Sequence, residues 1–203
     1  MHRMDSHKQH LLELARRGQI IRSRELKAEG IPRVTLTRLV REGHLERVGN
    51  GLYSLPNMQV SEHTALAQVA KKCPRGIICL LSALRVHDLT TQSPHEVWLA
   101  IPGKARPPKL EYPALRIVRF SGQALTEGIV EHEFDGIGVR VTNIPKTVAD
   151  CFKYRNKVGL DVALEALQEA HRSRRMEIDE LWYFAKICRV ARIMRPYIES
   201  LTA

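Results

Sequence analysis

The sequence predicts an α+β protein in which a small helix-rich domain precedes a larger domain of strands and helices. Three observations predict it. Helical apolar spacing leads into a Gly-Asn-Gly turn within the first 56 residues, apolar runs typical of strands fill the middle of the chain, and helical spacing returns after Pro145. The 203 residues and 44% hydrophobic content suffice for two cores, which we place at 1–57 and 58–203.

The first domain is expected to begin with an amphipathic helix, followed by a short apolar pair and a second helix. The apolar face of the first helix comprises Leu11, Leu12, Leu14 and Ala15. Gly18 is a stop signal after this face, and residues 20–21 are apolar but too few to stand alone. Ser23 can accept a hydrogen bond from the amides that open a helix at 24–29, which Gly30 then ends.

A third, basic helix is predicted from Pro32 to about Glu42, because proline at a first helical turn fixes φ without losing a hydrogen bond. Its inward stripe is Leu36, Leu39 and Val40. The opposite face then carries Arg33, Thr37, Arg38 and Arg41. These charges either read DNA or simply keep an exposed helix soluble, and the helix alone does not separate the two interpretations.

The segment after Gly43 predicts a β-hairpin, because Gly49-Asn50-Gly51 tolerates the positive φ angles of a tight turn. Arg47 lies at the base of this hairpin, and Tyr53 either packs on the core or donates to a phosphate. Helix, short strand, helix, basic helix and hairpin is the element order of a winged helix-turn-helix, whose basic helix enters the DNA major groove.

Arginine matches the acceptors of guanine, threonine can meet a phosphate or a thymine methyl, and a wing can follow the phosphate backbone. We therefore predict DNA contacts from Arg22, Arg24, Arg33, Thr35, Thr37, Arg38, Arg41, Arg47 and Asn50. The formal net charge of +10 favours the same polyanionic partner.

Composition also limits the class of protein. The longest apolar run, 77–84, is far shorter than a membrane span, and the N-terminal residues are polar, so we expect a cytoplasmic protein that binds no membrane. The cysteines are too widely separated for paired zinc ligation, and we expect buried thiols at Cys73, Cys79, Cys151 and Cys188. The histidines likewise lack metal-binding spacing, and we expect no metal and no cofactor.

In the second domain a Ser61-capped helix follows a linker near 56–61, and residues 77–84 fit either a buried strand or a helix start. Strands are expected at 97–101 and 115–120, a hairpin at 130–142, and helices at 147–152, 160–170, 181–188 and 190–201. Two basic segments are further candidates for DNA or partner contacts. The alternative interpretation of the first is a solvated loop, and that of the second is a set of cations favoured by the dipole at a helix C-terminus. The two segments supply Lys104, Arg106, Lys109, Arg172, Arg174 and Arg175.

Residues 11–56 resemble the N-terminal domain of AbiEi-type antitoxins, above all in the basic helix 36–43 and the hairpin 45–53. Weaker similarity continues at 82–89 and 142–151. The resemblance implies a bacterial type IV toxin–antitoxin, or abortive-infection, operon whose toxin is a nucleotidyltransferase-like protein. It further implies that the first domain represses the operon by binding inverted repeats and that the second supplies antitoxicity.

Other functions remain open at this stage. The chain could be a solitary winged-helix regulator without a toxin. An enzyme, such as a nuclease, is disfavoured because Glu96, Glu131 and Glu133 lack the partners that hold Mg²⁺, and no nucleotide-binding or serine-nucleophile motif is present. We therefore predict no catalytic residue. A protein-binding module could use the aromatic residues Trp182, Tyr183, Phe184 and Tyr197, which core packing also explains.

Overall fold

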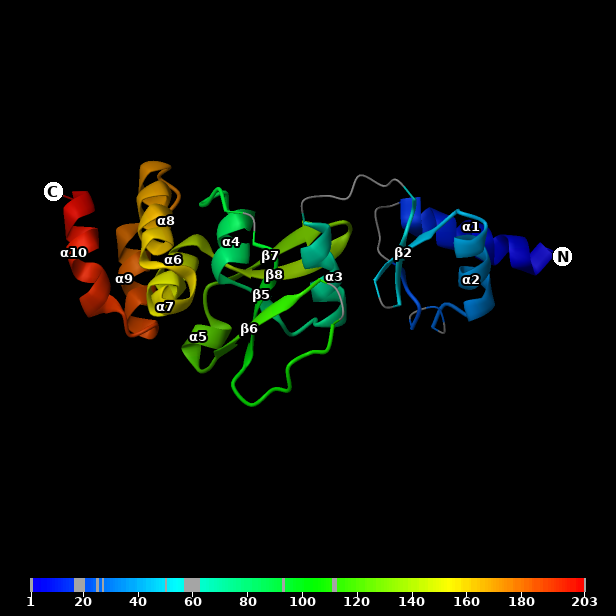
Figure 1. Ribbon diagram of the computed structural model, residues 1–203, viewed down its shortest axis with the longest axis horizontal. Coiled ribbons are helices and arrows are strands. Elements are labelled where there is room, and N and C mark those ends of the chain that lie inside the picture. Colours follow the sequence, from blue (N-terminus) through cyan, green and yellow to red (C-terminus); the bar gives the residue numbers. More distant parts are fainter. Residues whose placement is uncertain are drawn as a thin grey trace. The chain divides into compact units, whose positions relative to one another are not determined.

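The computed structural model describes residues 2–16, 21–24, 26, 28–49, 51–56, 63–92, 94–110 and 113–202. The fold is α+β, as the sequence predicts (Figure 1). Contacts divide it into one compact unit of Met1–Pro74, Lys109–Ala114 and Glu133–Val139 and a second of Arg75–Pro108, Leu115–His132 and Arg140–Ala203. The boundary expected between residues 57 and 58, the linker around it and the cap Ser61 lie outside the described residues.

The first unit contains the predicted first helix, basic helix and hairpin in that order. Its elements are α1 (His2–Arg16), β1 (Ile21–Arg22), α2 (Arg33–Arg41), β2 (Glu46–Gly49), β3 (Leu52–Ser54) and α3 (Thr64–Lys72). The strands form an antiparallel sheet in the order β1-β3-β2, and α1 packs on α2. Leu11 of α1, Leu36 and Leu39 of α2 and Leu45 are buried together, so the apolar stripes predicted for both helices do meet in one core.

Two details of this unit differ from the sequence prediction. α1 begins at His2, well before its apolar face, because polar residues can extend a helix whose C-terminal half is anchored by packing. Arg24 and residues 28–30 lie in turns and Leu26 has 3₁₀ conformation, so these residues do not form the α-helix predicted at 24–29. So short a helix gains little from propagation, and the backbone here is held otherwise. The N–H of Ser23 donates to the carbonyl of Gly51 at 3.0 Å, and that of Ile31 to Leu26 at 2.8 Å.

The second sheet has five strands in the order β6-β5-β4-β8-β7. They are β4 (Ile77–Ile78), β5 (Val97–Pro102), β6 (Leu115–Phe120), β7 (Ile129–Phe134) and β8 (Ile137–Thr142). β4 pairs antiparallel with β5 and parallel with β8, while β5 and β6 are parallel. The predicted hairpin is confirmed, with Asp135 and Gly136 at φ values of +52° and +71° in its two-residue turn.

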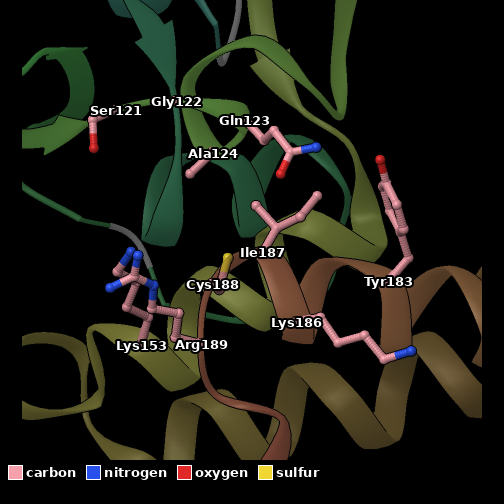
Figure 2. Close-up of a pocket in the computed structure, with 10 residues that line it drawn as sticks. All are labelled: Ser121, Gly122, Gln123, Ala124, Lys153, Tyr183, Lys186, Ile187, Cys188 and Arg189. Carbon is pink, nitrogen blue, oxygen red and sulfur yellow. The ribbon is translucent and has the colours of Figure 1, made fainter.

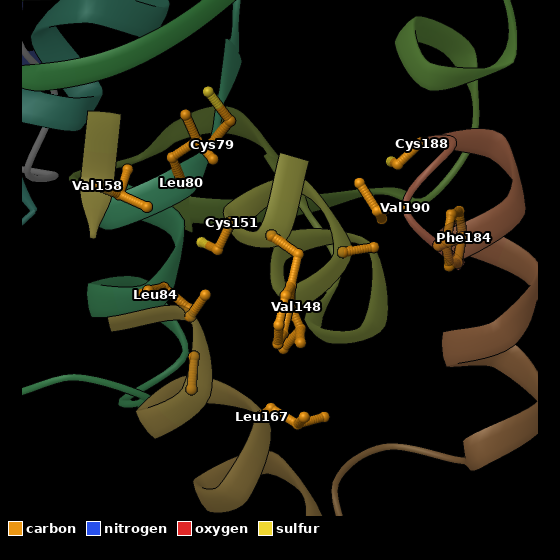
Figure 3. Close-up of a cluster of buried hydrophobic side chains, with 14 of the residues drawn as sticks. Cys79, Leu80, Leu84, Val148, Cys151, Val158, Leu167, Phe184, Cys188 and Val190 are labelled. Carbon is orange, nitrogen blue, oxygen red and sulfur yellow. The ribbon is translucent and has the colours of Figure 1, made fainter. Parts of the chain in front are cut away.

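Helices lie between the strands of this sheet and after the last of them. They are α4 (Leu80–Val86), α5 (Gln123–Thr126), α6 (Ile144–Lys153), α7 (Arg155–Val158), α8 (Leu160–Arg172), α9 (Ile178–Ile187) and α10 (Ala191–Thr202). The segment 77–84, which fits either a strand or a helix, contains both β4 and the start of α4. α6 contacts α4, α8 and α9, and its Val148 and Cys151 lie in the core beside Leu84 and Leu167 (Figure 3).

An ion pair is buried inside this core. Lys146 Nζ donates to Asp150 Oδ2 at 2.7 Å, and the two side chains are 0% and 1% exposed. The Lys146 ammonium also lies 4.4 Å from the ring centroid of Phe120. The Cys188 thiol donates to Asp150 Oδ1 at 3.1 Å. Burial raises the pKa of Asp150, and the charge of Lys146 opposes that increase. These contacts compensate for the removal of both charges from water.

Removing one partner of this pair should destabilise the protein strongly. In Asp150→Ala the Lys146 ammonium stays buried without its carboxylate, and we expect a loss of about 3–5 kcal/mol in the free energy of unfolding. Lys146→Met combined with Asp150→Leu should cost less, because no unpaired buried charge remains. Urea unfolding followed by circular dichroism measures both variants. Arg192→Met, at an exposed position on α10 away from the pair, is the control and should stay within about 0.5 kcal/mol. A double variant less stable than Asp150→Ala would contradict this account.

Candidate nucleic-acid interface

Helix α2 begins and ends where the sequence predicts. Pro32 is its N-cap, with φ −65° and ψ 138°, and its carbonyl accepts the N–H of Thr35 at 3.0 Å. Gly43 at φ +72° ends the helix in the left-handed region that glycine tolerates best. Leu36 and Leu39 are 3% and 0% exposed, so their burial fixes which face of α2 is turned outward.

The outward face carries four of the predicted side chains and one that sequence reasoning missed. We call Arg33, Val34, Thr37, Arg38 and Arg41 the α2 face. Arg33, Thr37 and Arg41 are exposed and Arg38 is partly exposed. Val34 is 70% exposed, although valine is usually buried. The signal was available, because residue 34 stands one helical turn before Thr37 and Arg38 and outside the stripe of Leu36, Leu39 and Val40.

Thr35 is placed differently from its prediction as a DNA contact. It is 5% exposed and lies on the buried side of α2 with Leu36 and Leu39. The reason is helical geometry, since residue 35 is four positions before Leu39 and so shares its face. Thr35 therefore packs inside the unit and does not reach the outward face of α2.

A chain of charges holds Arg38 against its own helix. Lys8 of α1 donates from Nζ to Glu42 Oε2 at 2.9 Å, and Arg38 Nε lies 3.6 Å from Glu42 Oε1. His44 Nε2 is 3.6 Å from the same carboxylate. Arg38 Nε is buried and has no hydrogen-bond acceptor among the described residues, so this end of the guanidinium is held by the charge of Glu42 alone. Sequence reasoning missed this network because Lys8 is remote in the chain.

The hairpin of β2 and β3 forms the predicted wing. Arg47 of β2 is exposed and stands opposite Tyr53 of β3, and Tyr53 packs partly buried against the core. Gly51 has φ +69°, and a Cβ there would lie 2.9 Å from Ser23 Oγ, so this turn needs glycine. Arg24 is exposed beside this sheet, and Arg22 belongs to β1. Asn50 lies outside the described residues.

The further basic candidates do not form a comparable face. Lys104, Arg106 and Lys109 are exposed, in a loop whose carbonyls accept hydrogen bonds from Arg119 Nη1, as at Gly103 with 2.6 Å. Arg172 pairs with Glu169, and Arg175 Nη1 donates to the His87 carbonyl at 2.6 Å. Arg174 is exposed at φ +54°. Two of these arginines thus have structural partners.

The described residues contain no group of three or more histidine, cysteine or acidic side chains that could hold a metal ion. None of the four cysteines forms a disulfide, and Cys73 is only partly buried where it ends α3, which corrects the expectation for that residue. Among the described helices, none has the length and apolar content of a membrane span. Of the four aromatic candidates for a partner surface, Phe184 is buried, Trp182 and Tyr197 pack against the core, and Tyr183 is 48% exposed.

The first unit therefore has the architecture of a winged helix-turn-helix, with an exposed basic helix beside a β-hairpin. Residues 9–56 match the family model of the AbiEi antitoxin transcriptional regulators. This confirms the resemblance seen in the sequence for the helices and the wing. None of the curated proteins compared with the chain matches it.

The charge network around Glu42 should be visible in its titration. The hydrogen bond from Lys8 lowers the pKa of Glu42, with help from the charges of Lys8, Arg38 and His44. Because the pKa of Glu42 is lower in the folded state than in the unfolded chain, its ionised carboxylate stabilises the fold at pH values above the unfolded-state pKa. This stabilisation is lost as the pH falls through the folded-state pKa. In Lys8→Gln we expect the midpoint of Glu42 to rise, as followed by carboxyl NMR. Arg16→Gln, on the same helix but outside the network, should leave it unchanged. An unshifted midpoint in Lys8→Gln would refute the network.

Proposed function

We propose that this protein is a DNA-binding transcriptional repressor that reads the major groove with the α2 face. The observation that carries the proposal is the exposure of Arg33, Thr37 and Arg41 on one helix, while the opposite stripe is buried. A helix fits the major groove, where an arginine can donate two hydrogen bonds to guanine O6 and N7.

The wing and the valine supply complementary contacts in this proposal. Arg47 on the exposed side of β2 suits the phosphate backbone, which fixes register but carries no sequence information. Val34 is an apolar side chain at the centre of a basic face, and a thymine methyl is the apolar group that the major groove offers. The α2 face would thus read both base-pair types, and an operator of inverted repeats would engage two copies of the unit.

We further propose that the regulator acts as the antitoxin of a type IV toxin–antitoxin, or abortive-infection, operon. The match of residues 9–56 to regulators of the AbiEi antitoxin type supports this. Its partner would be a nucleotidyltransferase-like toxin encoded in the same operon. Co-expression with the neighbouring gene tests the pairing. Rescue of growth by the full chain supports the antitoxin role, and a non-toxic neighbour leaves a solitary regulator.

The test of DNA binding is a gel shift on duplexes from the region upstream of the gene. Binding should weaken steeply with salt, because each neutralised phosphate contributes about 0.9 to the logarithmic salt slope. Arg38→Ala with Arg41→Ala should lose roughly 10- to 100-fold in affinity, as expected for lost base or phosphate contacts of about 1–3 kcal/mol. Arg192→Ala with Arg195→Ala removes the same charge from exposed positions of α10 and is the matched control. Equal losses in both double variants would reject α2 as the recognition helix.

Val34→Ala should separate base recognition from phosphate binding. Loss of the apolar contact should weaken binding to thymine-containing sites by a few-fold. The ratio of affinities between these sites and sites with the thymine replaced should therefore fall, while the salt slope stays the same. Competition gel shifts with single-base operator variants provide the measurement. Val34 is 70% exposed, so the substitution should leave the melting temperature unchanged. A changed salt slope with unchanged base preference would argue against the contact.

A further inference from the structure

The second unit contains an open pocket of about 880 Å³ between the end of β6 and helix α9 (Figure 2). Roughly 300–1,000 Å³ is the size of sites that hold small ligands. We call this site the cationic pocket, and its lining residues used below are Ser121, Lys153, Tyr183, Lys186, Ile187 and Arg189. None of its lining residues is acidic.

The positive charges of the pocket come from Lys153, Lys186 and Arg189. Among the described residues, no carboxylate forms an ion pair with Lys153, Lys186 or Arg189, and all three are exposed. Two acids contact side chains behind or beside the wall. Asp150 has both oxygens held by Lys146 and Cys188, and Glu127 accepts the hydroxyl of Tyr183. Burial raises the pKa of Asp150, whereas the charges of Lys146 and Lys153 lower it. A concave surface with uncompensated positive charge concentrates anions.

The remaining walls offer a polar edge and a flat apolar surface. Ser121 contributes a hydroxyl and lies across the pocket from Lys153 and Arg189, which project on the same side in Figure 2. Tyr183 stands at the other end, 48% exposed, and its hydroxyl donates to the carboxylate of Glu127. That bond fixes the ring in place, and an exposed, fixed aromatic ring provides a stacking surface.

The pocket is built for binding and not for thiol chemistry. Cys188 lines it, but burial raises the pKa of this thiol to about 12, and its hydrogen points to Asp150. A thiol with so high a pKa is not a nucleophile at neutral pH.

We propose that the cationic pocket binds a phosphate-bearing small molecule of nucleotide size, with the phosphate between Lys153 and Arg189 and the ring against Tyr183 and Ile187. Two neighbouring cations, Lys153 and Arg189, can bind a phosphate by charge-assisted hydrogen bonds, whereas Lys186 extends away from them in Figure 2. The aromatic wall selects an organic phosphate over the inorganic ion. The site goes beyond the proposed DNA-binding function and does not rest on it, since its residues belong to the second unit alone.

The test is isothermal titration of the full chain, without DNA, with AMP, ADP, inorganic phosphate and adenosine. We expect saturable binding of ADP and AMP, at least about tenfold weaker binding of inorganic phosphate, and none of adenosine. Lys153→Gln with Arg189→Gln should weaken ADP binding by roughly 100-fold, since a hydrogen bond to a charged group contributes about tenfold or more. Ser121→Glu is a second, exposed variant that places a carboxylate in the pocket and should abolish binding while melting as the parent does.

The matched control is Lys104→Gln with Arg174→Gln. It removes the same charge from exposed positions, and Arg174 shares the left-handed backbone of Arg189, with φ values of +54° and +59°. Unchanged ADP binding in the control supports the site. Equal loss in both double variants, or no saturable binding by the parent protein, would overturn it.

Duplex DNA is the other source of phosphate, and its binding to the same variants is measured separately. Should the pocket variant lose affinity for DNA but not for ADP, its cations contact a nucleic-acid backbone and the small-molecule site is wrong. A parent protein that binds ADP but no DNA would reject the proposed repressor and leave the pocket standing, so the two proposals fail separately.

Discussion

The buried Lys146–Asp150 pair is the constraint on which the second unit depends. It joins three elements at one point, because Lys146 lies over Phe120 of β6 and Asp150 accepts the thiol of Cys188 at the end of α9. Two charges without water are stable only when every group has a partner in the right place, so the pair tolerates one arrangement of α6 and its neighbours. Cys188 also lines the cationic pocket, and the same contact therefore positions the wall of that site.

Much of the fold could be predicted from periodicity, and its failures have physical causes. The stripe of Leu36, Leu39 and Val40 located α2 to within a residue because packing and helical spacing agree there. The short helices α5 and α7 carry too few residues to show a period. Just before the segment 24–29, the N–H of Ser23 donates to the carbonyl of Gly51, which is distant in the sequence. Such tertiary bonds leave no local pattern.

The outward side of α2 could be predicted from the sequence, but two of the residues on or off it could not be assigned by residue type. Helical spacing placed Arg33, Thr37 and Arg41 outward, and the same spacing should have moved Thr35 inward and Val34 outward. Residue type alone indicates the opposite placement, because threonine is a polar DNA-contacting side chain and valine is an apolar one. The Glu42 network and the cationic pocket arise from side chains distant in sequence, so only the folded chain brings them together.

Glu42 gives the proposed recognition helix a selectivity that bare arginines would lack. Its carboxylate restrains Arg38 at 3.6 Å, so less rotamer freedom is lost when the guanidinium meets a base. The same carboxylate repels phosphates, and DNA must therefore offer Arg38 a better acceptor than Glu42 does. A bidentate guanine edge meets that demand, whereas a single screened phosphate contact hardly does. An acid beside the basic face thus weakens non-specific binding more than specific binding, which is what a regulator in a large excess of other DNA requires.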